Sequence, residues 1–145
     1  MKPTNIFVAA FLSMAALQVS PAASATIYVV ANTAAKTIDV TNDQLKQLFL
    51  DESTIVVNGV KLRPIDAPSN SEVRREFYKI VAQRSATQMK SYWARMVFTG
   101  KGIPPQTSTS EAEVEKVIAT DGQKIGYLSR KPSDPNVQIV KILEN

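Results

Sequence analysis

The sequence has 145 residues, of which 17 are lysine or arginine and 13 are aspartate or glutamate, and its formal net charge at pH 7 is +4. It contains no cysteine and no histidine, which excludes disulfides, thiolate and imidazole metal sites, and the commonest general acid–base residue of enzymes. No pair of carboxylates stands out, so we expect no catalytic residue, metal, cofactor or enzymatic activity. The charge is too small and dispersed to indicate a nucleic-acid partner, which usually requires a concentrated basic stripe.

Residues 1–25 have the pattern of a secretory signal peptide. Lys2 supplies a positive charge, residues 6–19 form an apolar run, and Ala23-Ser24-Ala25 is an A-x-A motif that places cleavage before Thr26. The run of about 14 residues is shorter than the roughly 20 of a membrane-spanning helix, and an uncleaved anchor is the alternative. Because no cysteine can carry a lipid, we expect residues 26–145 to be released into the periplasm, with secretion from the cell as the alternative.

Residues 26–145 suit one domain with one modest core, and they carry a formal charge of +3 once Lys2 is removed. The segment from Thr26 to Ala31 is rich in β-branched residues and long enough for a buried strand. Thr41 begins a helix, because Gln44 three residues further on completes a capping box. Behind it, three apolar residues repeat at helical spacing, namely Leu45, Leu48 and Phe49.

A hairpin is expected next, with residues 54–57 and 60–65 as its strands. Asn58 and Gly59 between them tolerate the positive φ angles of a tight turn. A loop over residues 66–70 then leads into another helix. One apolar stripe runs along that helix, formed by Val73, Phe77, Ile80 and Val81.

Ser85 and Gln88 form a second capping box and begin a further helix. We expect this helix to bury one face made of Met89, Tyr92, Trp93, Met96 and Val97. It should end at residues 99–102, where glycine suits a left-handed C-terminal cap. The aromatic residues are interpreted as core rather than as a stacking platform; they are Phe77, Tyr78, Tyr92, Trp93 and Phe98.

The last third of the chain predicts one helix and two strands. Ser110 and Glu113 cap the short helix, and residues 124–129 and 137–143 have the apolar composition of strands. Strands that alternate with helices indicate the α/β class, here a mixed sheet of about five strands covered by about four helices. The final strand should return to the same sheet, because the chain has no other core to join.

The best candidate site is the loop Ser69-Asn70-Ser71 at the start of a helix, with Arg74 one turn inside. A helix N-terminus presents unpaired N–H groups and a partial positive charge, so it attracts anions. Short polar side chains can donate to an oxyanion, and arginine can bind it with paired donors. The alternative is ordinary capping, in which Ser69 and Glu72 form a capping box and satisfy the helix end themselves.

A second candidate is the segment Thr99-Gly100-Lys101-Gly102. Its glycines would let backbone N–H groups approach a ligand, and Lys101 adds a positive charge. The alternative is a plain C-terminal helix cap that binds nothing.

Four segments resemble the phosphate-binding proteins of bacterial ABC transporters. Residues 40–50 (VTNDQLKQLFL) are similar to a family segment L-T-x-E-x-L-x-x-I-F-L-G, and residues 124–128 (KIGYL) to a late G-A-I-G-Y-V strand. Residues 66–77 match the place of the family's phosphate loop, and residues 92–105 resemble a stretch of its short relatives. The resemblance implies a single periplasmic-binding-protein-like lobe over residues 26–145.

The resemblance also implies a function. It aligns Ser71 and Arg74 with the serine and arginine of the family's phosphate loop, whereas Asn70, Glu72 and Val73 replace glycine, glycine and threonine. Family members bind phosphate between two lobes, and this chain matches one, so a homodimer could supply the second half. The partners implied are phosphate or a similar oxyanion and a membrane transporter. The alternative is an accessory protein-interaction or sensory domain that keeps the lobe without binding phosphate.

Overall fold

A computed structural model describes residues 24–35, 37–51 and 53–145, so nearly all of the expected signal peptide lies outside the described residues. In chain order the elements are β1 (Thr26–Asn32), α1 (Asn42–Lys46), the π-helical turn η1 (Gln47–Asp51), β2 (Ile55–Val57), β3 (Val60–Asp66), α2 (Glu72–Ala82), α3 (Ala86–Phe98), β4 (Gln106–Thr107), α4 (Glu111–Thr120), β5 (Lys124–Leu128) and β6 (Val137–Glu144). In the part of the chain that is described, no helix is both long and apolar enough to span a bilayer.

The strands form one mixed sheet in the order β2-β3-β5-β1-β6, with the short β4 beside β3. Strand β1 lies antiparallel to both β5 and β6, while β3 runs parallel to β5. The prediction of a mixed α/β sheet is confirmed, including the return of the last strand, whose Leu143 pairs with Ile27 of β1. Strand β4 was not predicted, because a strand of two residues is too short for a periodic pattern.

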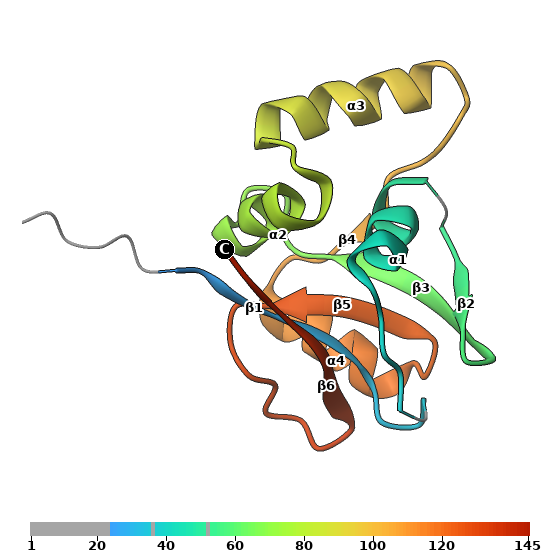
Figure 1. Cartoon of the computed structure of the whole chain (residues 1–145), viewed down its shortest axis with the longest axis vertical. Coiled ribbons are helices and arrows are strands. Elements are labelled where there is room, and N and C mark those ends of the chain that lie inside the picture. The colour runs from blue at the N-terminus through green and yellow to red at the C-terminus, as the bar shows by residue number, and fades with distance from the viewer. Residues whose placement is uncertain (1–23, 36, 52) are drawn as a thin grey trace, which may run out of the picture.

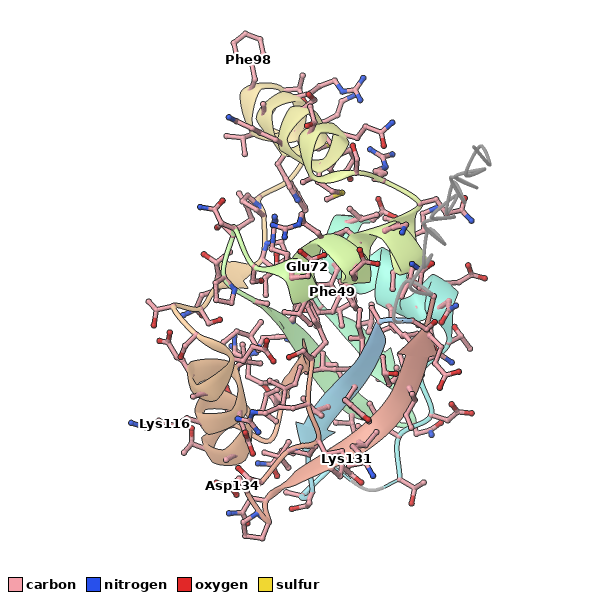
Figure 2. The ribbon with its side chains drawn as sticks, turned by 90° about the vertical axis from the view of Figure 1, so that its left-hand side faces the viewer. Phe49, Glu72, Phe98, Lys116, Lys131 and Asp134 are labelled. Atoms are coloured by element: carbon pink, nitrogen blue, oxygen red, sulfur yellow. The ribbon has the colours of Figure 1, made fainter. Side chains whose placement is uncertain are left out.

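Both faces of the sheet are buried, and the side chains of β1 alternate between them. Val29 and Ala31 belong to the larger core with α1, η1 and α2, whereas Val30 belongs to a smaller core with α4. Figure 2 shows α4, which carries Lys116, and the α1 region on opposite sides of the sheet, with Phe49 in the interior. The chain therefore forms three layers, with the sheet between two layers of helices, as expected for an α/β domain.

Three aromatic rings join the helices to the sheet in the larger core. Phe77 of α2 stacks on Tyr127 of β5 with ring centroids 3.8 Å apart, and Phe49 meets Phe77 edge-to-face at 4.8 Å. On the other face of β5, Gly126 leaves room for close packing. A Cβ atom there would lie 2.9 Å from a methyl group of Val114 and 3.0 Å from the carbonyl oxygen of Ile65.

The predicted turn and capping residues adopt the expected geometry. Asn58 and Gly59 both have positive φ angles, 50° and 80°, and join β2 to β3. The capping boxes at Thr41 and Ser85 are both complete. At α4 the Ser110 hydroxyl accepts from the third residue as predicted.

Two predictions about α3 are wrong. Phe98 is 90% exposed and Val97 is 54% exposed, although both were expected in the core. Figure 1 shows why: α3 lies at one end of the molecule beyond α2, so only its inner side meets the body. That inner side buries Met89, Tyr92 and Trp93, and helical periodicity alone could not show where the support for the helix ends.

Candidate functional site

The loop predicted as an anion site surrounds a buried carboxylate at the end of β3. Only 1% of the Asp66 side chain is exposed. Its Oδ2 atom accepts from Arg74 Nε at 2.8 Å and from the Tyr78 hydroxyl at 3.0 Å. Its Oδ1 atom accepts from the Tyr127 hydroxyl and from the Ala67 N–H at 3.1 Å. Both oxygens are thus fully used, as a buried charge requires.

The ion pair between Asp66 and Arg74 dominates the electrostatics of this loop. Burial lowers the pKa of Arg74, but the attraction and hydrogen bond of Asp66 outweigh it and leave that pKa raised. Burial and the negative charge of Asp66 both raise the pKa of Tyr78 and of Tyr127 well above its ordinary value. Arg74, Tyr78 and Tyr127 therefore keep their protons at neutral pH, and the positive charge of Arg74 lies directly against the carboxylate that it pairs with.

Ser71 is the N-cap of α2. Its hydroxyl oxygen accepts from the Arg74 N–H at 3.4 Å and donates its own proton to the Pro68 carbonyl at 2.7 Å. The alternative capping box of Ser69 and Glu72 is wrong, because the chain turns at Pro68 and the helix begins only at Glu72 itself. Glu72 is the first residue of the helix, N1, so it cannot take the N3 position that a capping box requires; Arg74 occupies that position.

The remaining polar side chains of the loop lie at the surface. Glu72 forms an ion pair with Arg75, so its carboxylate does not fold back over the helix end. Arg75 also donates to the Asn70 carbonyl at 3.0 Å. Ser69 and Asn70 are exposed, while Val73 is buried in the core. The structure thus brings together four of the five expected site residues, namely Ser69, Asn70, Ser71 and Arg74.

Lys101 lies elsewhere. Gly100 has a φ of 65°, and the N–H groups of Gly100 and Lys101 donate to the carbonyls of Val97 and Met96, which is the Schellman arrangement at the end of α3. The expectation of a left-handed glycine cap is confirmed. Lys101 lines a cavity whose walls include none of the α2 loop residues, so it is separated from the Ser71 loop.

Sequence reasoning missed the centre of this site. Asp66 is the last residue of β3, directly after the predicted strand of residues 60–65, and a carboxylate there is a usable signal for a functional or pairing role. The sequence pattern places Tyr78 in the core and Tyr127 in a late strand, and it does not indicate that either hydroxyl contacts a carboxylate. Among the residues that the structure describes, no group of three Asp or Glu side chains is arranged to hold a metal ion.

The described residues thus form one α/β domain in which a loop connects the end of β3 to the N-terminus of α2. No protein-family model matches the sequence, and no curated protein matches it. Solved structures do resemble it. One is a phosphate ABC transporter substrate-binding protein with bound phosphate from Clostridium perfringens, with a TM-score of 0.61, 18% identity, and coverage of 81% of this chain and 45% of that one.

Two further structures resemble the chain. An ABC-type phosphate transport receptor from Vibrio cholerae matches with a TM-score of 0.61 and 16% identity, and the match covers 81% of this chain and 46% of the receptor chain. A possible phosphate-binding protein from Planctomyces limnophilus matches with a TM-score of 0.51 and 14% identity, and the match covers 72% of this chain and 36% of that protein's chain. The chain therefore has the fold of part of such proteins and spans less than half of their length.

Proposed function

We propose that this chain is an exported binding module that binds phosphate or a similar oxyanion non-covalently at the N-terminus of α2. The observation that carries the proposal is the exposed loop before α2, set beside Arg74 in a fold similar to that of a phosphate-bound transport protein. The sequence pattern of residues 1–25 supports export to the periplasm. A membrane transporter is the partner that such a module would serve, and no chemical step is involved.

The donors in this loop favour weak and reversible binding. Helix α2 has 11 residues, and the first N–H groups of any α-helix lack partners within the helix. Ser69 and Asn70 are exposed beside them and can donate to oxyanion oxygens. The charge of Arg74 is balanced by Asp66, so little net attraction remains. We expect a dissociation constant in the millimolar range, which corresponds to a standard binding free energy of about −4 kcal/mol.

A second subunit would make the site tighter. A dehydrated phosphate needs many donors to replace its water, and one lobe offers them from one side only. In a homodimer, a second copy of the chain would cover the oxyanion from the other side. Binding of phosphate would then strengthen dimerisation, which sedimentation at several phosphate concentrations would measure.

The test uses two variants with opposite expected effects. Calorimetric titration with inorganic phosphate should give weaker binding for Arg74→Gln, because donors are lost. It should give tighter binding for Asp66→Asn, because the charge of Arg74 is no longer balanced. Arg95→Gln is the matched control, since it removes an exposed cation from α3. Absence of heat and of any thermal shift at millimolar phosphate would remove the proposal.

An accessory protein-interaction domain is the second candidate, and the far end of α3 favours it. Phe98 is 90% exposed and Ile103 is 75% exposed there, which a partner protein could cover. Crosslinking in the periplasm separates the two candidates. A captured partner that survives Arg74→Ala but is lost with Phe98→Ser would favour the interaction domain over the oxyanion module.

A further inference from the structure

The segment around α3 carries positive charges only. Residues 77–110 contain five lysines and arginines and no aspartate or glutamate, whereas the rest of residues 26–145 contains 11 of the former and 13 of the latter. Lys79 of α2 lies near Glu76, with 3.7 Å between Nζ and Oε2. The other four cations belong to α3 or flank it, and none forms an ion pair with a carboxylate of the described residues; they are Arg84, Lys90, Arg95 and Lys101. The surface around α3 is therefore cationic, although the net charge of the chain is small.

The outer side of α3 is exposed and uncharged. A helix turns by about 100° per residue, so residues spaced three or four apart share one side. Met89 marks the buried inner side, where Asp51 also lies and accepts from the Tyr92 hydroxyl at 3.4 Å. Lys90 and Arg95 leave the helix on the two flanks of its outer side. The outer side itself carries Thr87, Ser91, Ala94 and Phe98, all of which are exposed.

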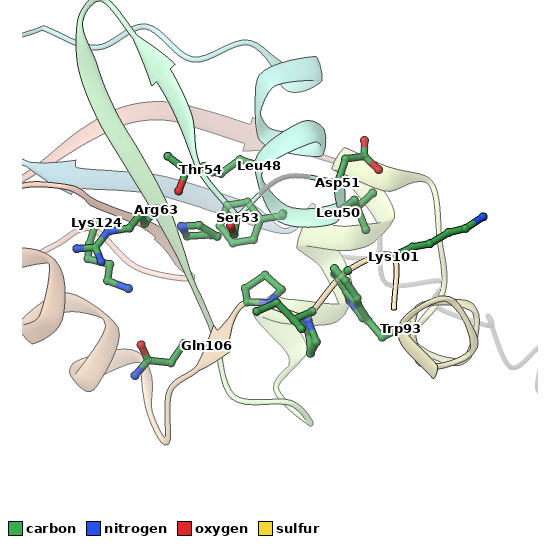
Figure 3. A pocket seen from close by; sticks show the side chains of 16 residues that line it. Leu48, Leu50, Asp51, Ser53, Thr54, Arg63, Trp93, Lys101, Gln106 and Lys124 are labelled. Atoms are coloured by element: carbon green, nitrogen blue, oxygen red, sulfur yellow. The ribbon is translucent and has the colours of Figure 1, made fainter. Parts of the chain in front are cut away.

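Three exposed apolar side chains lie at the far end of α3. Phe98 is 90% exposed, Ile103 is 75% exposed and Val97 is 54% exposed. Figure 2 shows the Phe98 ring at the extreme end of the molecule, pointing away from the body. Lys101 borders the cavity described above together with Trp93, but Figure 3 shows its side chain pointing away from that cavity. The end of the molecule is thus a convex apolar tip with cations around it.

A convex apolar tip among unpaired cations has the chemistry of an interfacial membrane anchor. Aromatic and aliphatic side chains enter the boundary between lipid headgroups and acyl chains, while lysine and arginine stay at the level of the phosphates. Such insertion needs no complementary pocket, whereas a protein partner would have to provide one for a ring as exposed as that of Phe98. A bilayer that contains anionic lipid also presents negative charge over a whole plane, which matches the spread of cations along α3. The shape and the charge of this surface therefore favour a bilayer over an acidic protein.

We propose that the outer side of α3 docks the chain reversibly onto an anionic phospholipid bilayer. Phe98 inserts into the headgroup boundary with Val97 and Ile103 beside it, and the cations around the tip contact the lipid phosphates. The docking does not depend on the proposed oxyanion site, because no residue of the α2 loop takes part in it. Failure of either proposal therefore leaves the other standing.

Co-sedimentation with vesicles in a phosphate-free buffer tests the proposal. The form used is residues 26–145, which contains every element of the fold but not the apolar run of residues 6–19. Vesicles of phosphatidylglycerol and phosphatidylcholine in equal parts should bind it at least about tenfold more tightly than phosphatidylcholine alone at about 0.05 M NaCl. Raising NaCl to about 0.5 M should remove most of this difference, because salt screens the cations.

Matched variants assign the contact to the tip. Phe98→Ser should weaken binding to the anionic vesicles about tenfold, because the ring no longer enters the bilayer. Lys90→Gln combined with Arg95→Gln should weaken it about 25-fold, at about fivefold for each cation near a charged surface. Val56→Ser is the control for the first, since Val56 is 66% exposed on β2, and Lys116→Gln of α4 is the control for the second. Both controls should change binding by less than about twofold.

Insertion of the tip has its own readout. Phe98→Trp adds a second tryptophan, whose fluorescence should be quenched by anionic vesicles with brominated acyl chains. Trp93, the single tryptophan of the sequence, is 9% exposed and should keep its signal. Val56→Trp is the matched control and should show no quenching of the added tryptophan.

Any of four results would overturn the proposal. They are no binding to anionic vesicles at low salt, equal binding to neutral vesicles, unchanged binding after Phe98→Ser, and no quenching in bound Phe98→Trp. Millimolar inorganic phosphate that displaces the vesicles more than NaCl of equal ionic strength would also overturn it, by assigning the lipid phosphate to the α2 loop. Binding of poly-glutamate that is as tight as binding to vesicles and insensitive to Phe98→Ser would assign the cations to an acidic protein instead. Circular dichroism confirms that each variant is folded before it is used.

Discussion

Replacing Asp66 by asparagine keeps the shape of the side chain but removes the charge that Arg74 faces. The Oδ1 contacts with Tyr127 and Ala67 can persist, because the amide retains one oxygen. At the Oδ2 position an NH₂ group would face two donors, Arg74 Nε and the Tyr78 hydroxyl. The variant therefore loses a buried ion pair and two hydrogen bonds together.

Removing one partner of a buried ion pair costs about 3–5 kcal/mol. Arg74 is 15% exposed and can recover some hydration, so we expect the lower end, about 3 kcal/mol. For a domain of this size that loss lowers the melting temperature by about 10 °C. Urea unfolding followed by circular dichroism measures it, with Asp39→Asn, an exposed aspartate, as the control.

The double variant Asp66→Asn, Arg74→Met provides a second readout. Because it leaves no uncompensated charge in the loop, it should lose less stability than the two single variants combined, by at least about 1 kcal/mol. A loss below about 0.5 kcal/mol for Asp66→Asn, or strict additivity in the cycle, would refute the view that this pair holds the loop together.

Three more predictions follow from the packing and the ionisable groups. Gly126→Ala should cost about 1–3 kcal/mol in thermal unfolding, since its Cβ would clash with α4 and β3, and a neutral result would contradict the close packing described above. The pKa values of Tyr78 and Tyr127 are raised in the folded state above the ordinary value of 10.0. The free energy of unfolding should therefore be unaffected by these two groups below pH 10.0 and should fall as the pH rises above it, because the unfolded chain loses its tyrosine protons first. Replacing both by phenylalanine should flatten that fall, and an unchanged pH dependence of the stability in urea unfolding would count against the assignment. Phe98→Ser should change stability by less than about 0.5 kcal/mol, because the ring is exposed; a large loss would place it in a contact that the structure lacks.

The elements of the fold could be predicted because their signals are local. A capping box such as that of Thr41, or a turn such as Asn58-Gly59, depends on residues within a few positions of each other. Phe98 lies nine residues after Met89, which at about 100° per residue places it on the side of α3 opposite the apolar stripe, so helical periodicity already indicates its exposure. The exposure of Val97 could not be predicted, since Val97 continues that stripe. Its exposure depends on where the body of the molecule ends, which is a tertiary property.

The candidate site was predicted in position but not in its internal chemistry. The loop before α2 and the presence of Arg74 beside it follow from the sequence. The burial of Asp66 does not follow from the sequence, because Tyr127, which donates to the same carboxylate as Arg74, is 61 residues away in the chain. The cavity lined by Arg63, Trp93 and Lys124 was missed for the same reason, because these residues come to one cavity only through strand pairing and the return of the chain after α3.

The central claim, an oxyanion site at the start of α2, is tested most directly by amide NMR spectra recorded during a phosphate titration. The account predicts saturable shifts of the backbone N–H signals of residues 69–74, with residues 101–106 around the separate cavity unaffected. Unchanged signals for residues 69–74 at millimolar phosphate would contradict it, as would shifts confined to residues 101–106.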